Sequence, residues 1–335
     1  MTVHRILVGT YTQDDAQGIY WASFNDKNGQ FDGQGLAIES ESPAFLCRID
    51  NHVYAVNEAV EGGVSAFELR ADTLRFINRE SSLGSLPCHI TASLHWIAVA
   101  NYGSGSVAVF RRDSNGAIGE KTSHVIHEGS GPVSDRQRCA HAHEVHLVSD
   151  TELMVPDLGA DCVYHYRIDP RGVLNVNPST TSVKPGSGPR HIVAHPQHPL
   201  NYLLNELSNT IAVLHRTDIH HEQEFVSTLP TGYRGSSTTA EIQLSNDGRF
   251  VYASNRGHNS IVTMAIDDRG LPCAPSWVPT YGEHPRFFCL DPTQKWLMVA
   301  NQQSDNVTVY PLVNGRPTEA TSTASIPTPT YMLFI

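Results

Sequence analysis

The chain has 335 residues, with 23 Lys and Arg against 34 Asp and Glu, which gives a formal charge of −11. Charged residues make up only 17% of the chain, which argues against a disordered acidic protein, and the net acidity argues against a nucleic-acid partner, which needs a basic face. No apolar run approaches the roughly 20 residues of a membrane span, so no membrane partner is expected.

One pattern recurs along the chain. A β-type apolar run ends in a small polar residue, a few turn residues follow, and a second β-type run begins, as in "IAVANYGSGSVAVF" and "VYASNRGHNSIVTMAI". The residues that end the first run are Thr10, Asn57, Asn101, Asp157, Asn205, Asn255 and Asn301. They lie about 48 residues apart, so seven repeats of propeller-blade length cover the chain.

Each repeat consists of short β-branched and aromatic runs separated by Gly, Asn, Asp and Pro, which is typical of strands and hairpins. In the fifth repeat we expect strands over residues 190–195, 201–207 and 210–216, and a less regular one near 224–229. Four strands repeated seven times predict an all-β fold, a seven-bladed β-propeller with four antiparallel strands per blade. The alternative is a pair of β-sandwiches with accidental periodicity.

The two ends of the chain predict how the ring closes. The run His4–Gly9 resembles the second strand of a repeat, whereas Tyr331–Ile335 resembles a first strand with nothing after it. We expect these two strands to pair and to complete one blade, because closure removes open sheet edges. Residues 1–335 are therefore expected to form a single propeller domain.

Polar residues cluster near the starts of the predicted first strands. In a propeller these strands line the central channel, so polar groups from several blades should collect at one mouth of it. Antiparallel pairing predicts four facing pairs: His143 with Asp157, Arg190 with Glu206, Glu241 with Asn255, and Arg286 with Asn301.

These residue types have acid–base and anion-binding chemistry. Histidine titrates near neutral pH, so His143 can act as a general base toward water, and Asp157 could orient its imidazole. The guanidinium groups of Arg190 and Arg286 can hold phosphate, carboxylate or a developing oxyanion. Glu206 could pair with Arg190 or contact substrate hydroxyls.

Several residues favour other interpretations. The chain has 18 histidines, and an isolated histidine usually packs or lies on the surface. An asparagine that recurs in five repeats is typical of a turn rather than of catalysis. His141 and His143 form an HxH pair, but no third ligand is evident, so we expect no metal and no other cofactor.

The cellular compartment follows from the cysteines and the N-terminus. None of the six cysteines lies in a CxxC motif, and their spacing suggests neither a zinc site nor a dense disulfide framework. The first residues lack the charged and apolar regions of a signal peptide. We therefore expect a reduced, cytoplasmic protein.

The segments "GSGPRHIVAHP", "NELSNTIAVL", "SNDGRFVYASNRGHNSI" and "HPRFFCLDPTQKWLMVANQQSDNVTVY" resemble the lactonase family of seven-bladed β-propellers. That family includes a bacterial 6-phosphogluconolactonase and the fungal carboxy-cis,cis-muconate lactonizing enzyme. The resemblance covers essentially the whole chain, and it implies a metal-free site of one histidine, two arginines and one glutamate. By motif these are His143, Arg190, Glu206 and Arg286, with Asp157, Arg256 and Glu241 expected to contact the substrate.

The resemblance implies an enzyme that hydrolyses a sugar lactone, and 6-phospho-D-glucono-1,5-lactone of the pentose phosphate pathway is the leading expectation. One alternative is the reversible lactonization of a muconate-type tricarboxylate. Another is a non-catalytic propeller that serves as a protein-binding platform. Two positions depart from the family pattern, because Ala140 replaces a common proline and Gln243 stands where histidine is frequent. The oligomeric state does not follow from the sequence.

Overall fold

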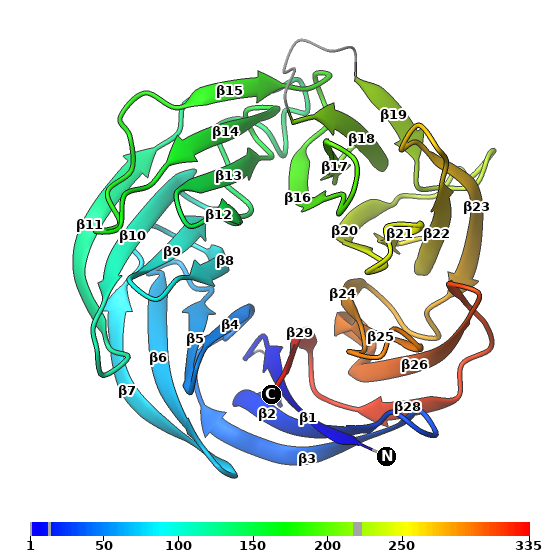
Figure 1. Ribbon diagram of the computed structural model, residues 1–335, viewed down its shortest axis with the longest axis horizontal. Helices are drawn as coiled ribbons and strands as arrows, with labels where there is room; N and C mark the ends of the chain where they lie inside the picture. The colour runs from blue at the N-terminus through cyan, green and yellow to red at the C-terminus, as the bar shows by residue number, and fades with distance from the viewer. Residues whose placement is uncertain (1, 13–14, 217–222) are drawn as a thin grey trace. The chain divides into compact units, whose positions relative to one another are not determined.

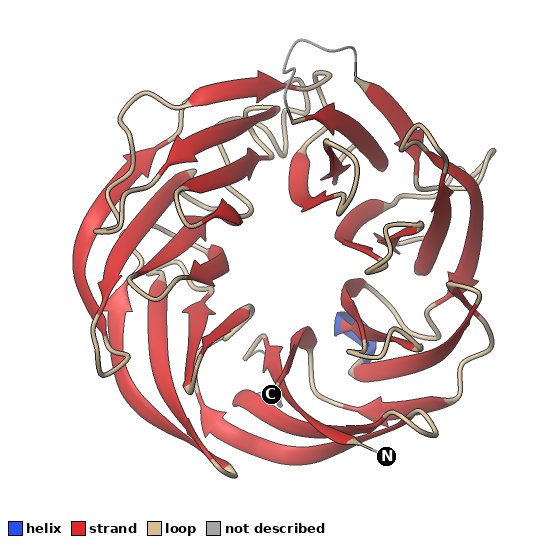
Figure 2. Cartoon of the chain, in the orientation of Figure 1, coloured by secondary structure: helices blue, strands red, loops and turns tan. Residues whose placement is uncertain are grey.

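The computed structural model describes residues 2–12, 15–216 and 223–335, and nearly all of its regular structure is β-strand (Figure 2). Within these residues the strands form seven antiparallel sheets, the blades of a seven-bladed β-propeller (Figure 1). The predicted fold class is confirmed. The described residues contain a single short 3-10 turn, Gln302–Ser304, and no helix long and apolar enough to cross a membrane.

Blades 1 to 4 have the following strands. Blade 1 contains β29 (Pro329–Phe334), β1 (Val3–Thr10), β2 (Gly18–Asn25) and β3 (Gln30–Glu39). Blade 2 contains β4 (Leu46–Ile49), β5 (His52–Asn57), β6 (Gly63–Arg70) and β7 (Thr73–Ser81). Blade 3 contains β8 (Pro87–Ala92), β9 (Trp96–Asn101), β10 (Ser106–Arg112) and β11 (Ile118–Ile126). Blade 4 contains β12 (His146–Ser149), β13 (Glu152–Asp157), β14 (Cys162–Arg167) and β15 (Ser179–Ser182).

Blades 5 to 7 complete the chain. Blade 5 contains β16 (Pro189–Ala194), β17 (Leu200–Asn205), β18 (Thr210–His215) and β19 (Glu224–Ser227), close to the predicted ranges. Blade 6 contains β20 (Thr238–Leu244), β21 (Phe250–Arg256), β22 (Ser260–Ile266) and β23 (Pro272–Pro279). Blade 7 contains β24 (Pro285–Leu290), β25 (Trp296–Asn301), β26 (Asn306–Val313), β27 (Arg316–Pro317) and β28 (Ser322–Ser325).

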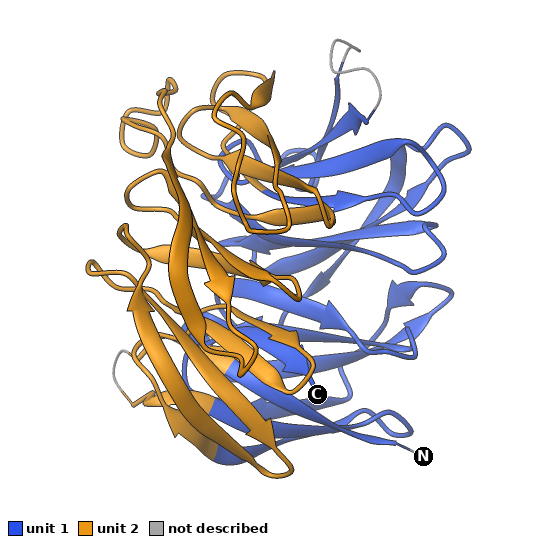
Figure 3. Ribbon diagram, turned by 60° about the vertical axis from the view of Figure 1, so that its left-hand side comes forward, with its two compact units in different colours: residues 1–8, 20–35, 191–335 blue, residues 9–19, 36–190 orange. Residues whose placement is uncertain are grey.

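The chain divides into two compact units (Figure 3). One unit comprises residues 1–8, 20–35 and 191–335, and the other comprises residues 9–19 and 36–190. Within each unit the apolar cores lie between consecutive blades. In the first, Tyr202 of blade 5 packs in one cluster with Val262 of blade 6. In the second, Tyr54 of blade 2 packs in one cluster with Ile97 of blade 3. Burial between sheets thus supplies the main apolar contacts within each unit.

The asparagines that recur at the ends of the second strands are structural. All five are fully buried, and the side-chain amides of four of them donate to backbone carbonyls in the segment before the first strand of the same blade, whereas Asn205 donates to the Thr210 hydroxyl. Asn57 donates to Glu41, Asn101 to Ser82, Asn255 to Thr228 and Asn301 to Thr280, at 2.7–3.1 Å. Each of these four asparagines therefore ties the incoming chain to its own blade and satisfies a buried carbonyl.

A second recurring contact joins consecutive blades through a tyrosine. The hydroxyl of Tyr54 in blade 2 donates to the carbonyl of Gly116 in blade 3, at 2.9 Å. Tyr202 and Tyr252 make the same contact with Gly270 and Gly315 in the following blades. Gly116 has φ +82°, and a Cβ there would lie 1.9 Å from the His52 ring, so glycine is required by both conformation and space.

The chain ends complete one blade, as predicted. Strand β29 pairs with β1, and the Ile335 amide donates to the Arg5 carbonyl at 2.9 Å. Met332 of β29 is buried in one cluster with Ile6 and Phe24. The C-terminal strand therefore covers an edge and fills part of an apolar core.

Deletion of residues 328–335 should prevent stable folding, because it removes β29 and exposes the edge of β1 and its core. We propose that residues 1–335 unfold as one cooperative domain, so the loss should be global. Thermal unfolding followed by circular dichroism checks this. Deletion of Ile335 alone is the matched control, with an expected change of only a few degrees. A protein shortened by eight residues that melts with the full chain would contradict the closure.

Candidate active site

The first strand of several blades carries an extra residue near its start. In blade 3, Pro87 pairs with Asn101 and His89 with Ala100, which leaves Cys88 in a β-bulge. Blade 7 repeats this arrangement, with Pro285 opposite Asn301 and Phe287 opposite Ala300, so that Arg286 is the bulged residue. Bulges change the direction of a side chain and are frequent beside active sites.

Blades 4 and 6 have the same irregularity. Ala142, rather than His143, pairs with Asp157, and His146 then pairs with Met154, which implies one extra residue in between. In blade 6, Thr239 pairs with Asn255 and Ile242 with Ala253, so Ala240 and Glu241 stand against a single residue. The predicted facing of His143 with Asp157, of Glu241 with Asn255 and of Arg286 with Asn301 is therefore wrong, because a bulge adds a residue that the alternating pattern does not reveal.

His143 is buried, with 5% of its surface exposed, and a thiol lies beside it. The Sγ of Cys88 donates to the His143 carbonyl at 3.2 Å and lies 3.8 Å from the His143 Nδ1. The Tyr102 ring meets the imidazole edge-on, with ring centres 5.5 Å apart, and stacks on His141 at 4.5 Å. His143 thus sits against a cysteine and an aromatic ring, in an environment that holds its orientation.

The carboxylate of Asp157 binds a different histidine. Its Oδ2 accepts from Nδ1 of His127 at 2.8 Å, and both side chains are fully buried. Its Oδ1 accepts the amides of His141 and Ala160, at 2.8 and 2.9 Å. The other nitrogen of His127 contacts the Tyr166 hydroxyl at 2.9 Å. These contacts fix the backbone that leads to His143 rather than its side chain.

His127 was missed by the sequence reasoning, although a positional signal existed. It is the first residue after the fourth strand of blade 3, where Thr228 and Thr280 stand in blades 5 and 6. The buried asparagine of the following blade binds the carbonyl of each of these threonines. Asp157 and His127 therefore replace the repeated contact between asparagine and backbone by an ionisable pair.

Asp157→Ala should destabilise the protein by about 3–5 kcal/mol, because it leaves the buried His127 without its acceptor. Asp157→Asn keeps the side-chain size used in the other blades and should cost less. Chemical denaturation gives the free energy of unfolding, and KM of the folded fraction should stay near that of the wild type. A variant of normal stability whose KM rises strongly would instead place Asp157 in contact with the substrate.

Glu206 and Arg256 form a buried ion pair. Glu206 Oε2 lies 2.8 Å from an Arg256 nitrogen, and the two side chains are 3% and 8% exposed. Arg256 also donates to the Thr239 carbonyl at 2.6 Å. Glu206 follows Asn205, and Arg256 follows Asn255, so the pair joins equivalent positions of blades 5 and 6. The residue that directly follows the recurring asparagine can therefore reach the same position of the next blade.

A second carboxylate on the first strands is also paired. Glu241 Oε2 lies 3.0 Å from Nδ1 of His191, and both residues are more than nine-tenths buried. In blades 3 and 4, His89 and Glu144 stand 3.9 Å apart. His89 directly follows the bulged Cys88, and Glu241 is one of the two residues in the bulge of β20. His191 was not selected from the sequence, although it directly follows Arg190.

The structure distributes the predicted residues over the two units. His143, Asp157 and Arg190 belong to the unit that contains residues 36–190, and Arg190 is buried at the start of β16. Glu206, Glu241, Arg256 and Arg286 belong to the other unit. Arg286 differs from the rest in being only half-buried.

The described part of the chain contains no cluster of three or more His, Cys, Asp or Glu side chains placed to hold a metal ion. In the HxH pair, Nδ1 of His141 contacts the Tyr102 carbonyl at 2.8 Å, and its Nε2 lies 3.8 Å from the Cys139 thiol. All six cysteines are free.

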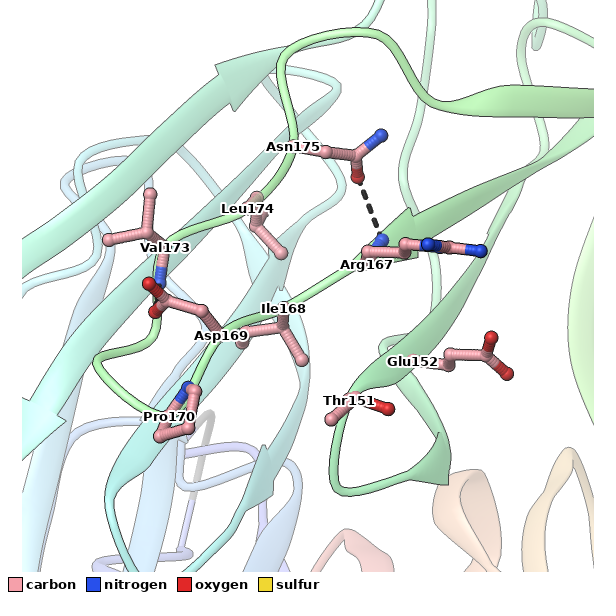
Figure 4. A pocket seen from close by; sticks show the side chains of 9 residues that line it. All are labelled: Thr151, Glu152, Arg167, Ile168, Asp169, Pro170, Val173, Leu174 and Asn175. Carbon is pink, nitrogen blue, oxygen red and sulfur yellow. Dashed lines mark hydrogen bonds between the residues drawn. The ribbon is translucent and has the colours of Figure 1, made fainter.

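A cavity of about 520 Å³ lies elsewhere in blade 4 (Figure 4). It is lined by residues of the β13 start and of the turn after β14, including Glu152, Arg167 and Asp169. Figure 4 shows Asn175 accepting the Arg167 amide across it, at 2.7 Å. Asp157 ends β13 on the other side of the blade, about 16 Å along a six-residue strand, so this cavity is separate from the candidate residues.

Comparisons with known proteins point to one family of propellers. The sequence profile described as "Lactonase, 7-bladed beta-propeller" matches residues 5–334. A Bacillus subtilis protein named 6-phosphogluconolactonase is 32% identical, with 100% of this chain and 99% of that protein covered. A crystal structure from Lactobacillus plantarum has a TM-score of 0.93 at 32% identity, with both chains fully covered. The Pseudomonas aeruginosa periplasmic gluconolactonase has a TM-score of 0.93 at 28% identity, with 100% and 99% covered.

Proposed function

We propose that this chain, which belongs to the lactonase family of seven-bladed β-propellers, hydrolyses 6-phospho-D-glucono-1,5-lactone to 6-phosphogluconate. Its family makes it an enzyme, a lactonase that acts on a lactone substrate. One observation carries the proposal: His143, Arg190, Glu206 and Arg256 are each at most 8% exposed. Buried ionisable groups are typical of a functional site. The reaction would belong to the pentose phosphate pathway.

The proposed reaction needs a base and groups that bind negative charge. His143 acts as the base that removes a proton from the attacking water. Arg190 stabilises the oxyanion that develops on the carbonyl oxygen, and Arg286, which is only half-buried, holds the phosphate. Glu206 fixes Arg256 through their ion pair, and Arg256 and Glu241 are the further residues proposed to contact the substrate.

The net charge of −11 opposes an anionic substrate at long range. Salt screens that repulsion beyond roughly 8–10 Å at physiological ionic strength, whereas an arginine in direct contact is little screened. We propose a cytoplasmic location as part of the same proposal, because six free cysteines fit a reducing compartment.

Hydrolysis of the unphosphorylated glucono-1,5-lactone is a second candidate. It is favoured by the similarity to the protein named periplasmic gluconolactonase, at 28% identity over nearly the whole of both chains. The two substrates share the ring and the scissile ester and differ in the phosphate. The difference therefore concerns the group that Arg286 is proposed to hold.

The full-length protein should hydrolyse freshly generated 6-phosphogluconolactone faster than glucono-1,5-lactone at equal concentration. Coupling to 6-phosphogluconate dehydrogenase follows the first reaction, a pH indicator follows the second, and spontaneous hydrolysis is subtracted from both. Activity should persist with EDTA, because no metal is proposed. Arg286→Gln should raise KM for the phosphorylated substrate alone. Equal rates on both lactones, unchanged in that variant, would favour the second candidate.

His143→Asn should lower kcat by about 10²–10⁴-fold and leave KM within a few-fold, because it removes the general base and keeps similar bulk. His165→Asn is the matched control, since His165 is a half-buried histidine on β14 that contacts Thr181. Burial lowers the pKa of His165. A folded His143→Asn protein with more than a tenth of wild-type kcat would remove His143 from the mechanism.

A further inference from the structure

Cys139 and His141 form a pair outside the residues proposed for lactone hydrolysis. The Cys139 Sγ lies 3.8 Å from the His141 Nε2, within reach of a hydrogen bond to sulfur. The thiol is exposed, and the imidazole is half-buried. We propose that Cys139 is a nucleophilic thiol, with His141 as its base, that forms a mixed disulfide with small anionic disulfides such as oxidised glutathione. The inference is independent of the proposed lactone hydrolysis.

The surroundings of His141 fix which ring nitrogen faces the thiol. Its Nδ1 lies 2.8 Å from the Tyr102 carbonyl, an oxygen that can only accept a hydrogen bond. The proton of the neutral ring is therefore on Nδ1, which leaves the lone pair on Nε2, the nitrogen beside Cys139. A nucleophile, a base within hydrogen-bond reach and a third group that orients the base are the parts of an activated nucleophile.

The position of His141 is fixed by contacts on its backbone and on its ring. Its amide donates to the Asp157 carboxylate at 2.8 Å, and the Tyr102 ring stacks on its imidazole with ring centres 4.5 Å apart. A Cβ at Gly159 would overlap the Cys139 carbonyl and lie 2.9 Å from the His141 ring, so the segment packs tightly there. The base is thus held in place before any ligand arrives.

The class of ligand follows from the charges around the thiol. Arg138 directly precedes Cys139, and Arg136 donates at 3.1 Å to the hydroxyl of Tyr102, the ring that covers the imidazole. Arg138 lies 3.7 Å from Asp135, a carboxylate that is 89% exposed, and surface pairs of this kind are weak. Oxidised glutathione carries more carboxylates than ammonium groups, so its net negative charge complements the two arginines.

The other cysteines provide a comparison within the same molecule. Burial raises the pKa of Cys47, Cys162 and Cys289, which keeps these thiols protonated and unreactive. Cys273 on β23 is exposed like Cys139, but no described side chain makes a hydrogen bond or an ion pair with its thiol. Cys139 and Cys273 therefore share access to solvent, whereas only the first of the two has a base beside it.

The reaction is a thiol–disulfide exchange. The Cys139 sulfur attacks one sulfur of the small disulfide as its proton passes to the His141 Nε2. The new S–S bond forms while the old one breaks, and the departing thiolate takes the proton from the imidazole. Cys139 is oxidised to a mixed disulfide, and one half of the small molecule is reduced to a thiol. An excess of the reduced thiol reverses the step.

The test is the rate at which oxidised glutathione modifies each cysteine of the full-length protein at pH 7, measured by mass spectrometry. A free thiol is only a few per cent ionised at this pH, so a base can raise its rate by at most about 30-fold. We expect Cys139 to react about tenfold faster than Cys273. His141→Asn should remove that advantage, because asparagine keeps a donor for the Tyr102 carbonyl but lacks Nε2.

His165→Asn is the matched control, since it removes a half-buried histidine of the same blade that contacts Thr181, and it should change neither rate. Equal rates for Cys139 and Cys273 in the wild type would overturn the proposal. A faster Cys139 whose rate is unchanged in His141→Asn would also overturn it. If circular dichroism shows that His141→Asn does not fold, the ratio of the two rates in the wild type decides alone.

Discussion

The contact on which the site depends is made by the buried asparagine at the end of the second strand in blades 2, 3, 6 and 7. Asn101, Asn255 and Asn301 donate to a carbonyl in the segment that precedes their own first strand. A backbone carbonyl buried without a donor is costly, so this bond sets where the incoming chain joins the sheet. The first strand then starts opposite the asparagine, and the residues that follow take the bulge. The asparagine contact thus repeats from blade to blade, whereas the side chain at the bulge, one residue further along the first strand, varies.

Because the asparagine contact sets the start of the first strand, the residue type at the bulge can differ between blades. Cys88 and Arg286 occupy the same structural step in different blades, although their chemistry has nothing in common. Asp157 shows the opposite behaviour, because it replaces the recurring asparagine and still performs the holding function, through His127 and the His141 amide. A position therefore predicts a role better than a residue type does. An ionisable residue at the asparagine position can be structural, whereas the residue at the bulge can take part in a reaction.

Much of the fold followed from the sequence, since the repeat length, the strands of blade 5 and the pairing of the chain ends are present in the structure. The register of the first two strands was predicted one residue off in blades 4, 6 and 7, because a β-bulge leaves no mark on hydrophobic alternation. The ion pair between Glu206 and Arg256 joins two blades, and pairing within one hairpin could not reveal it. His127 lies 30 residues from Asp157, so their contact also needed three-dimensional information.

The buried ion pairs bear on function through their cost. Taking two charges out of water is expensive, and apolar residues of similar volume are often equally or more stabilising at such places. The blades show that alternative directly, since Phe287 and Tyr331 pack against one another on the first strands of blades 7 and 1, with ring centres 4.3 Å apart. Stability alone would favour aromatic contacts of this kind throughout. The buried pair of His191 with Glu241 forgoes that gain, which is expected where charge serves chemistry rather than the fold.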